Sequence, residues 1–150
     1  MSANTAMDMA VSEGINVKRI LTHEDIAPGA DAPIEDRRGL SGCIPLVKIA
    51  GAAAEAGKSL DEILAIAERF NNNMATLAVA LKTATHPSSG EAIFDLADDE
   101  MEIGMGQHGE AGTGKSKMMT ADETAEIMIT QLSKAIDAQK GDKLFVMLNG

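Results

Sequence analysis

Aromatic side chains are scarce in this chain of 150 residues: they make up 2%, as three phenylalanines with no tryptophan or tyrosine. Basic residues are also few, since 13 lysines and arginines stand against 23 aspartates and glutamates, for a formal net charge of −10. Nucleic-acid-binding proteins attract the phosphate backbone with positive charge and often stack bases on aromatic rings. We therefore expect no nucleic-acid partner.

Cysteine is represented once, by Cys43, so no disulfide can form within the chain. A single thiol favours a reducing compartment, and we expect a cytoplasmic protein. No apolar run reaches the roughly eighteen residues that a membrane-spanning helix needs. The N-terminal residues carry acids and lack the basic-then-apolar layout of a signal peptide. No two of the three histidines share metal-ligand spacing, so we expect no metal site.

The residues present, 45% hydrophobic and 24% charged, are typical of a globular domain. Capping boxes at Ser59–Glu62 and Thr120–Glu123 mark the starts of two helices, because each pairs a hydroxyl with a glutamate three residues later. Pro45 fits the first position of another helix. We predict helices over 1–13, 45–56, 60–70 and 120–140, and strands over 15–21, 76–83, 91–96, 101–105 and 143–148. This mixture predicts an α/β fold, with a mixed sheet and flanking helices.

The segment 23–39 interrupts these patterns with two prolines, two glycines and several charges. Such a composition is typical of a loop or linker and marks the best candidate for a domain boundary. We predict that residues 1–39 are the tail of a first α/β domain with its linker. Residues 40–150 would then be most of a second domain.

The segment 104–116 holds five glycines, Gly104, Gly106, Gly109, Gly112 and Gly114. Glycine is favoured where backbone approaches a ligand closely. Part of this segment, Gly109-Glu-Ala-Gly-Thr-Gly-Lys-Ser116, fits the P-loop motif, in which backbone N–H groups hold phosphates and the lysine reaches the terminal ones. A P-loop helix should begin at the Gly-Lys-Ser, but here the helix signals begin only at Thr120. A nucleotide-binding P-loop at 109–116 is therefore one alternative.

A second interpretation rests on resemblance. The stretch Asp95-Leu-Ala-Asp-Asp-Glu-Met-Glu-Ile-Gly-Met-Gly-Gln-His-Gly-Glu-Ala-Gly112 is similar to the L-x-D-x-E-M-E-x-G-x-G-I-H-G-E-P-G of dihydroxyacetone kinases. Arg38-Gly-Leu-Ser-Gly42 and Lys48-Ile-Ala-Gly-Ala-Ala-Ala-Glu55 resemble that family's R-G-x-x-G-T and K-I-x-G-A-A-A-E. The closing Gly141-Asp142 and Val146-Met-Leu-Asn149 resemble its G-D-x-x-x-x-x-V-N. The likeness covers nearly the whole chain in the same order.

The resemblance implies that this chain is part of the two-domain, ketose-binding subunit of a dihydroxyacetone (glycerone) kinase. The histidine matching His108 would bond through a ring nitrogen to the ketone carbon, giving a hemiaminal. Gly109 and Glu110 would complete the binding segment. Mg-ATP or Mg-ADP would sit on a separate nucleotide-binding subunit, so we expect no cofactor on this chain. A homodimer is also expected.

The sequence departs from the family at three positions of this segment, where Gln107, Ala111 and Thr113 replace Ile, Pro and Ile. A more polar pocket rim would suit a more hydroxylated ketose such as erythrulose. The family's N-terminal part, which carries the lysine and aspartate that act on the substrate hydroxyl, has no counterpart in this chain. A further chain could supply that half. The second alternative is a non-catalytic ketose-sensing or scaffold module.

We expect little or no phosphorylation when this chain alone is mixed with a nucleotide-binding subunit, dihydroxyacetone and Mg-ATP. The resemblance implies that the chain carries the histidine that holds the ketose without the acid and base groups that act on its hydroxyl. A coupled assay for the phosphorylated ketose checks this, with an intact kinase as positive control. Measurable turnover would contradict the expectation.

Overall fold

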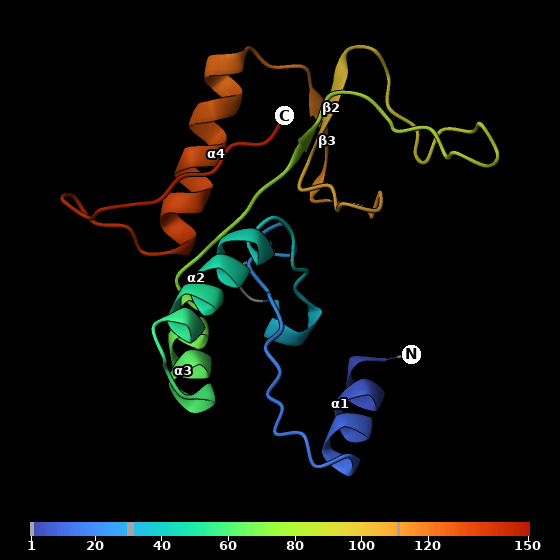
Figure 1. The fold of residues 1–150 in the computed structure, drawn as a ribbon. Coiled ribbons are helices and arrows are strands. Elements are labelled where there is room, and N and C mark those ends of the chain that lie inside the picture. The colour runs from blue at the N-terminus through green and yellow to red at the C-terminus, as the bar shows by residue number, and fades with distance from the viewer. Residues whose placement is uncertain (1, 30–31, 111) are drawn as a thin grey trace.

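The structure, a computed structural model, describes residues 2–29, 32–110 and 112–150. Within these ranges the chain forms four α-helices and a small sheet (Figure 1). Their bounds are α1 Ala3–Ser12, η1 (a 3₁₀ turn) Ile34–Asp36, α2 Cys43–Glu55, α3 Leu60–Asn71, β1 Val79–Ala80, β2 Glu100–Ile103, β3 Gly114–Lys117 and α4 Ala121–Ala135. The predicted α/β class is therefore confirmed.

Local signals account for the helix starts. Ser59 and Thr120 each accept a backbone N–H from the glutamate three residues on, and that glutamate accepts from the N–H of the cap, so both predicted capping boxes are present. Helix α2 begins at Cys43, two residues before the predicted Pro45. Proline is tolerated there because the first four N–H groups of a helix have no partner within it. Helix α4 ends at Ala135, before the predicted Lys140, and Asp137 follows in a left-handed conformation with φ 50°.

The sheet has the order β1-β2-β3 and is antiparallel throughout. Its register pairs Val79 with Ile103, and Ile103 also lies opposite Gly114. The parallel pairing implied by a mixed sheet is confined to an isolated bridge between Asp25 and Thr76. Strands β2 and β3 thus form a hairpin whose long loop contains His108.

Three predicted strands do not form among the described residues: 15–21 and 143–148 are extended without sheet partners, and 91–96 contributes only a bridge between Ala92 and Thr85. The predicted 76–83 strand is reduced to β1. A strand is stable only when its N–H and C=O groups are paired by neighbours. The sequence pattern is suited to strands here, but the part of the chain that the structure describes places no strand beside these segments.

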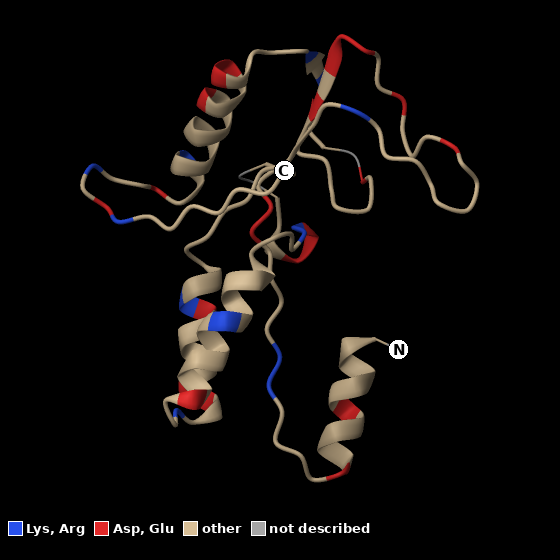
Figure 2. Ribbon diagram, turned by 45° about the horizontal axis from the view of Figure 1, so that its top comes forward, with Lys and Arg blue, Asp and Glu red and all other residues tan. Residues whose placement is uncertain are grey.

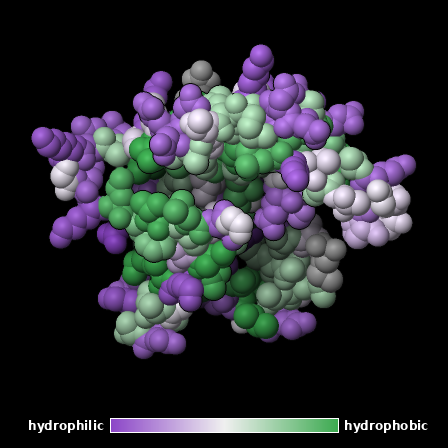
Figure 3. Space-filling model, turned by 90° about the horizontal axis from the view of Figure 1, so that it is seen from above, coloured by the Kyte–Doolittle hydropathy of each residue, from purple (hydrophilic) through white to green (hydrophobic). Residues whose placement is uncertain are grey.

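Few apolar side chains of the described residues are buried: Ala27, Leu46, Ala67, Leu77 and Met101. The chain exposes 10609 Å², whereas a compact protein of its mass exposes roughly 7,300 Å². Hydrophobic residues accordingly reach the surface over much of the face in Figure 3, and the segment 144–148 is exposed at every position. No helix within the described residues is long and apolar enough to cross a membrane.

The segment 23–39, predicted as a loop or linker, contains the two most buried carboxylates, Glu24 at 1% and Asp25 at 0% exposure. One carboxylate oxygen of Glu24 accepts the N–H groups of Leu40 (2.6 Å) and Gly42 (2.8 Å), next to the N-terminus of α2. A negative charge is favourable at that end of a helix. Nothing in the structure tests the predicted domain boundary after Gly39, which stays a prediction.

Replacing Ser59 by alanine should lower the free energy of unfolding by about 0.5–2 kcal/mol, because the cap of α3 is lost. Ser59→Asp is the matched control, since its carboxylate can still accept the N–H of Glu62. Urea unfolding followed by circular dichroism measures both. Equal midpoints for the alanine and aspartate variants would show that the cap does not stabilise α3.

Candidate functional site

The His108 loop, defined here as residues 104–113, connects β2 to β3 and is held at its base by backbone hydrogen bonds. The N–H of Gly104 donates to the Ala78 carbonyl at 2.6 Å, and that of Thr113 donates to the Ile103 carbonyl at 2.9 Å. Within the loop, the N–H of Gly106 donates to the Glu110 carbonyl at 2.8 Å. Residues 106–110 therefore make a closed turn with His108 at its exposed tip.

The three predicted site residues lie together in this turn. His108 and Glu110 are exposed, and Gly109 is half-buried. Gly109 has φ +82°, and a Cβ there would collide with Cγ2 of Ile93. Glycine at this position thus lets the turn close against the arm formed by residues 83–94.

Glu110 contacts the backbone of His108: its Oε2 accepts the His108 N–H at 2.9 Å. The pKa of Glu110 is lowered, mainly by a hydrogen bond from its own backbone N–H and then by the one from His108, with smaller contributions from the charges of His108 and Arg38. The carboxylate is therefore ionised at neutral pH and fixes the backbone at His108.

Arg38 joins the His108 loop to a buried carboxylate. Its Nε donates to Oδ2 of Asp25 at 2.5 Å, its Nη2 donates to the Gly104 carbonyl at 2.6 Å, and its Nη1 donates to the Glu110 carbonyl at 3.3 Å. The Arg38 side chain is 21% exposed and that of Asp25 is fully buried. The guanidinium thus spans the two ends of the turn.

Glu102 holds the other side of the loop. It is 7% exposed, and its Oε1 accepts the N–H of Gly112 at 2.9 Å. Acidic residues also gather on and before β2, whereas lysines lie on β3 (Figure 2). Lys115 approaches Glu100 across this pair, with Nζ 3.7 Å from Oε2.

This arrangement does not favour the P-loop alternative. Gly114, Lys115 and Ser116 lie in strand β3, whereas a P-loop places them at the start of a helix. The N–H groups of Gly109 and Gly112 donate to protein acceptors, one of them the Glu102 carboxylate. A buried negative charge where a phosphate would sit opposes anion binding. Ala111, also part of 109–116, lies outside the described residues.

The sequence signature of the Dak1 domain matches residues 1–150. The chain belongs to the Dak1 domain family. It is 39% identical over 150 residues to the dihydroxyacetone-binding subunit DhaK of PTS-dependent dihydroxyacetone kinase 1 from Listeria innocua, covering 100% of this chain and 46% of that subunit. It is 34% identical over 143 residues to L-erythrulose 1-kinase from Mycolicibacterium smegmatis, covering 92% of this chain and 25% of the enzyme.

Among solved structures, the dihydroxyacetone kinase operon co-activator Dha-DhaQ superimposes with a TM-score of 0.83 at 36% identity, covering 91% of this chain and 42% of that one. The Dak1 chain thus spans less than half the length of each of these relatives. The resemblance predicted from the sequence is confirmed at the level of the family.

Sequence reasoning missed four side chains that shape the His108 loop: Arg38, Asp25, Glu102 and, through the adjoining segment, Glu24. Arg38 belongs to the stretch Arg38–Gly42 that resembles a family motif, but the sequence indicated no role for its side chain. Asp25 lies in the segment assigned to a loop or linker, where charged residues are usually solvated. Nothing local signals that a carboxylate there will pair with an arginine thirteen positions later.

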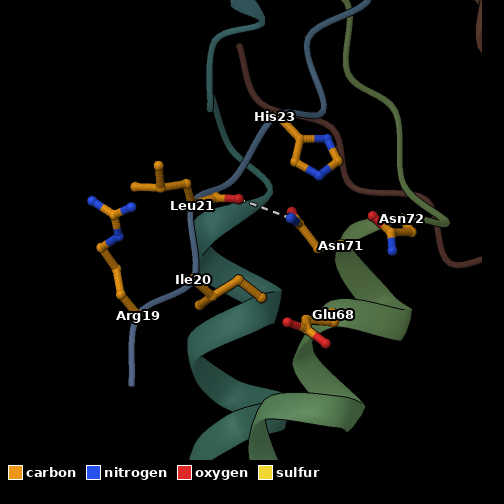
Figure 4. A pocket seen from close by; sticks show the side chains of 7 residues that line it. All are labelled: Arg19, Ile20, Leu21, His23, Glu68, Asn71 and Asn72. Carbon is orange, nitrogen blue, oxygen red and sulfur yellow. Dashed lines mark hydrogen bonds between the residues drawn. The ribbon is translucent and has the colours of Figure 1, made fainter. Parts of the chain in front are cut away.

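A hollow of about 320 Å³ lies away from the His108 loop, between the extended segment 19–23 and α3 (Figure 4). Its polar lining includes His23 and Asn71, and Asn71 Nδ2 donates to the Leu21 carbonyl at 2.8 Å. This bond ties the end of α3 to the extended segment. The hollow contains none of the predicted site residues.

The order of the turn around His108 should depend on pH in the acid range. Because the folded-state pKa of Glu110 is lowered, its contribution is complete above the unfolded value and is lost as pH falls through the folded value. The His108 amide signal, followed by NMR while the pH is lowered, measures this. Glu110→Gln should remove the transition and Glu126→Gln, on exposed α4, should keep it; a transition unchanged in Glu110→Gln would contradict the assignment.

Proposed function

We propose that this chain is the ketose-binding part of a dihydroxyacetone-type kinase and holds a short-chain ketose covalently on His108. The observation that carries the proposal is a histidine presented at the tip of a turn that is fixed on both sides, in a family whose relatives include a dihydroxyacetone-binding subunit and an erythrulose kinase. Gly109 and Glu110 complete the binding segment. Dihydroxyacetone and erythrulose are the candidate substrates.

The binding step needs only the imidazole and the ketone. The lone pair of the neutral ring nitrogen forms the new C–N bond, and the electrons of the carbonyl π bond move to oxygen. The oxygen gains a proton and the ring loses its N–H proton, so the net reaction adds N–H across C=O. Only carbonyl compounds can react in this way, which would discriminate ketoses from glycerol. Phosphoryl transfer then becomes a matter of positioning a fixed hydroxyl.

The nucleotide belongs, in this proposal, to a partner. Mg-ATP or Mg-ADP would be bound by a separate nucleotide-binding subunit or domain, and a homodimer in the cytoplasm is the expected assembly. The groups that act on the substrate hydroxyl would come from a part of the kinase outside these 150 residues, packed against them. The large exposed surface and the unpaired strand-like segments 15–21 and 143–148 support such a complement, because apolar surface in contact with water is unfavourable.

The similarity to an operon co-activator gives a reason to keep the ketose-sensing module as a second candidate. The two functions differ in turnover. A polypeptide with the N-terminal part of a related kinase subunit, added with the nucleotide-binding partner, should restore phosphorylation if this chain serves a kinase. Ketose binding without any turnover in the complete mixture would identify a sensor.

The direct test uses dihydroxyacetone labelled with ¹³C at the ketone carbon. We expect its NMR signal to move from the carbonyl to the hemiaminal region on addition of the chain, and the shifted signal to be absent with His108→Ala. His86→Ala is the matched control, since His86 is also exposed but belongs to another turn, in which the N–H of Gly90 donates to its carbonyl. Mg-ATP titrated in parallel should show no binding.

Three results would overturn the proposal: no adduct with the unmodified chain, an adduct that survives in His108→Ala, or binding of Mg-ATP without ketose. The last would return the 109–116 segment to consideration as a nucleotide site. Loss of the adduct in His86→Ala as well would show that the histidine substitutions act through general unfolding, and circular dichroism of each variant decides this.

A further inference from the structure

We infer that the ion pair of Arg38 with buried Asp25 is a positioning device for His108: its planar guanidinium joins the two ends of the turn and thereby sets the direction in which the imidazole is presented. This inference rests on the proposed function for its chemical meaning. Its structural part, the dependence of the loop on Arg38, can be tested without ketose.

Asp25 fixes the position of the Arg38 guanidinium. Its side chain is fully buried, Oδ1 accepts the N–H of Ala27 at 3.0 Å, and Oδ2 accepts Nε of Arg38 at 2.5 Å. The backbones of the two residues are also joined, since the N–H of Asp25 donates to the Arg38 carbonyl at 3.1 Å. With both carboxylate oxygens engaged and the main chains bonded, the guanidinium has little freedom to rotate.

The two terminal nitrogens of Arg38 hold the His108 loop. Nη2 bonds the carbonyl of Gly104, where β2 ends, and Nη1 bonds the carbonyl of Glu110, on the far side of His108. A Cβ on Gly106 would lie 2.5 Å from Nη1, so glycine is needed there for the guanidinium to reach across the turn. The carbonyls of Gly104 and Glu110 are thus held at a fixed distance from each other, with residues 105–109 between them.

The link from Arg38 to the imidazole passes through Glu110. The carbonyl of Glu110 accepts both Nη1 of Arg38 and the N–H of Gly106, and its carboxylate accepts the N–H of His108. Moving the Glu110 backbone would therefore displace both hydrogen bonds that define the turn. Arg38 acts on His108 through these groups and is a positioning residue, not a catalytic one.

Lysine cannot take over this role although it carries the same charge. The guanidinium offers donors in several fixed directions of one plane, whereas an ammonium is a single point of charge on a flexible stem. Arg38→Lys should therefore keep the charge pairing with Asp25, and with it the fold, but lose the bonds to the two carbonyls. Arg37→Lys is the matched control, because Arg37 is the neighbouring arginine and its Nε also donates to a carbonyl, but to that of Ala32, which is not part of the His108 loop.

The experiment measures three properties of both lysine variants: the melting temperature, the NMR amide exchange of Gly106 and His108, and the dissociation constant of the labelled ketose adduct. For Arg38→Lys we expect a melting temperature close to the original, exchange at both amides about tenfold faster, and an adduct about tenfold weaker, as for loss of a charge-assisted hydrogen bond. Amides of α3 serve as an internal reference. Arg37→Lys should change none of these.

The outcomes distinguish the positioning role of Arg38 from the proposed ketose binding on His108. If the unmodified chain forms the adduct and Arg38→Lys matches it in exchange and affinity, the positioning role is wrong and ketose binding stands. If Arg38→Lys loosens the loop but no chain forms the adduct, the proposed function fails while the structural dependence remains. If the melting temperature of Arg38→Lys falls and all amides exchange faster together, Arg38 serves general stability, and the inference is overturned.

Discussion

The ion pair between Asp25 and Arg38 is the contact on which the geometry around His108 depends. The segment 25–27, Arg38 and the segment 104–110 are joined by these two side chains. Taking two charges out of water costs several kcal/mol per ion unless the remaining donors and acceptors are also satisfied. Here both carboxylate oxygens of Asp25 and the three guanidinium nitrogens of Arg38 have partners, so Asp25 can be fully buried and the pair can determine where the loop lies.

Polar contacts have this prominence because the apolar core is small. The side chains with the least exposure are one methionine, Met101, and two carboxylates, Glu24 and Asp25. Loops in most domains are arranged by the packing of the elements that they connect. In this chain the loop around His108 is arranged by carboxylates: Glu110 accepts an N–H within the loop, Glu102 accepts one from its far end, and Asp25 holds the guanidinium of Arg38. Such bonds are directional, which suits a site where one imidazole must point one way.

Much of the fold could be predicted where the determining interactions are local. Both capping boxes and the helices that follow them were readable, because hydroxyl and glutamate lie three residues apart in the sequence. The strand expected at 101–105 corresponds to β2, Glu100–Ile103, where alternation of apolar and polar residues is again a local pattern. Whether the segments 15–21 and 143–148 form strands could not be predicted from local spacing. An alternating apolar pattern indicates a preference for extended backbone, but a strand also needs a neighbouring strand to pair with. The segment 109–116 also shows the limit of a local pattern. Its sequence matches the P-loop motif, but Gly114–Lys117 pair with β2, so backbone groups that would bind phosphate in a P-loop belong to a sheet here.

The sequence by itself determined the family, the α/β class, the starts of α3 and α4 and the choice of His108 as the candidate residue, because these depend on residue order and on spacings of a few positions. The tertiary structure decided which carboxylates are buried, which arginine bridges the turn, and whether Lys115 belongs to a helix start or a strand. Those outcomes depend on contacts between residues 13 to 72 positions apart. Only folding brings such residues together, and no local pattern records which of several arginines or aspartates will be chosen.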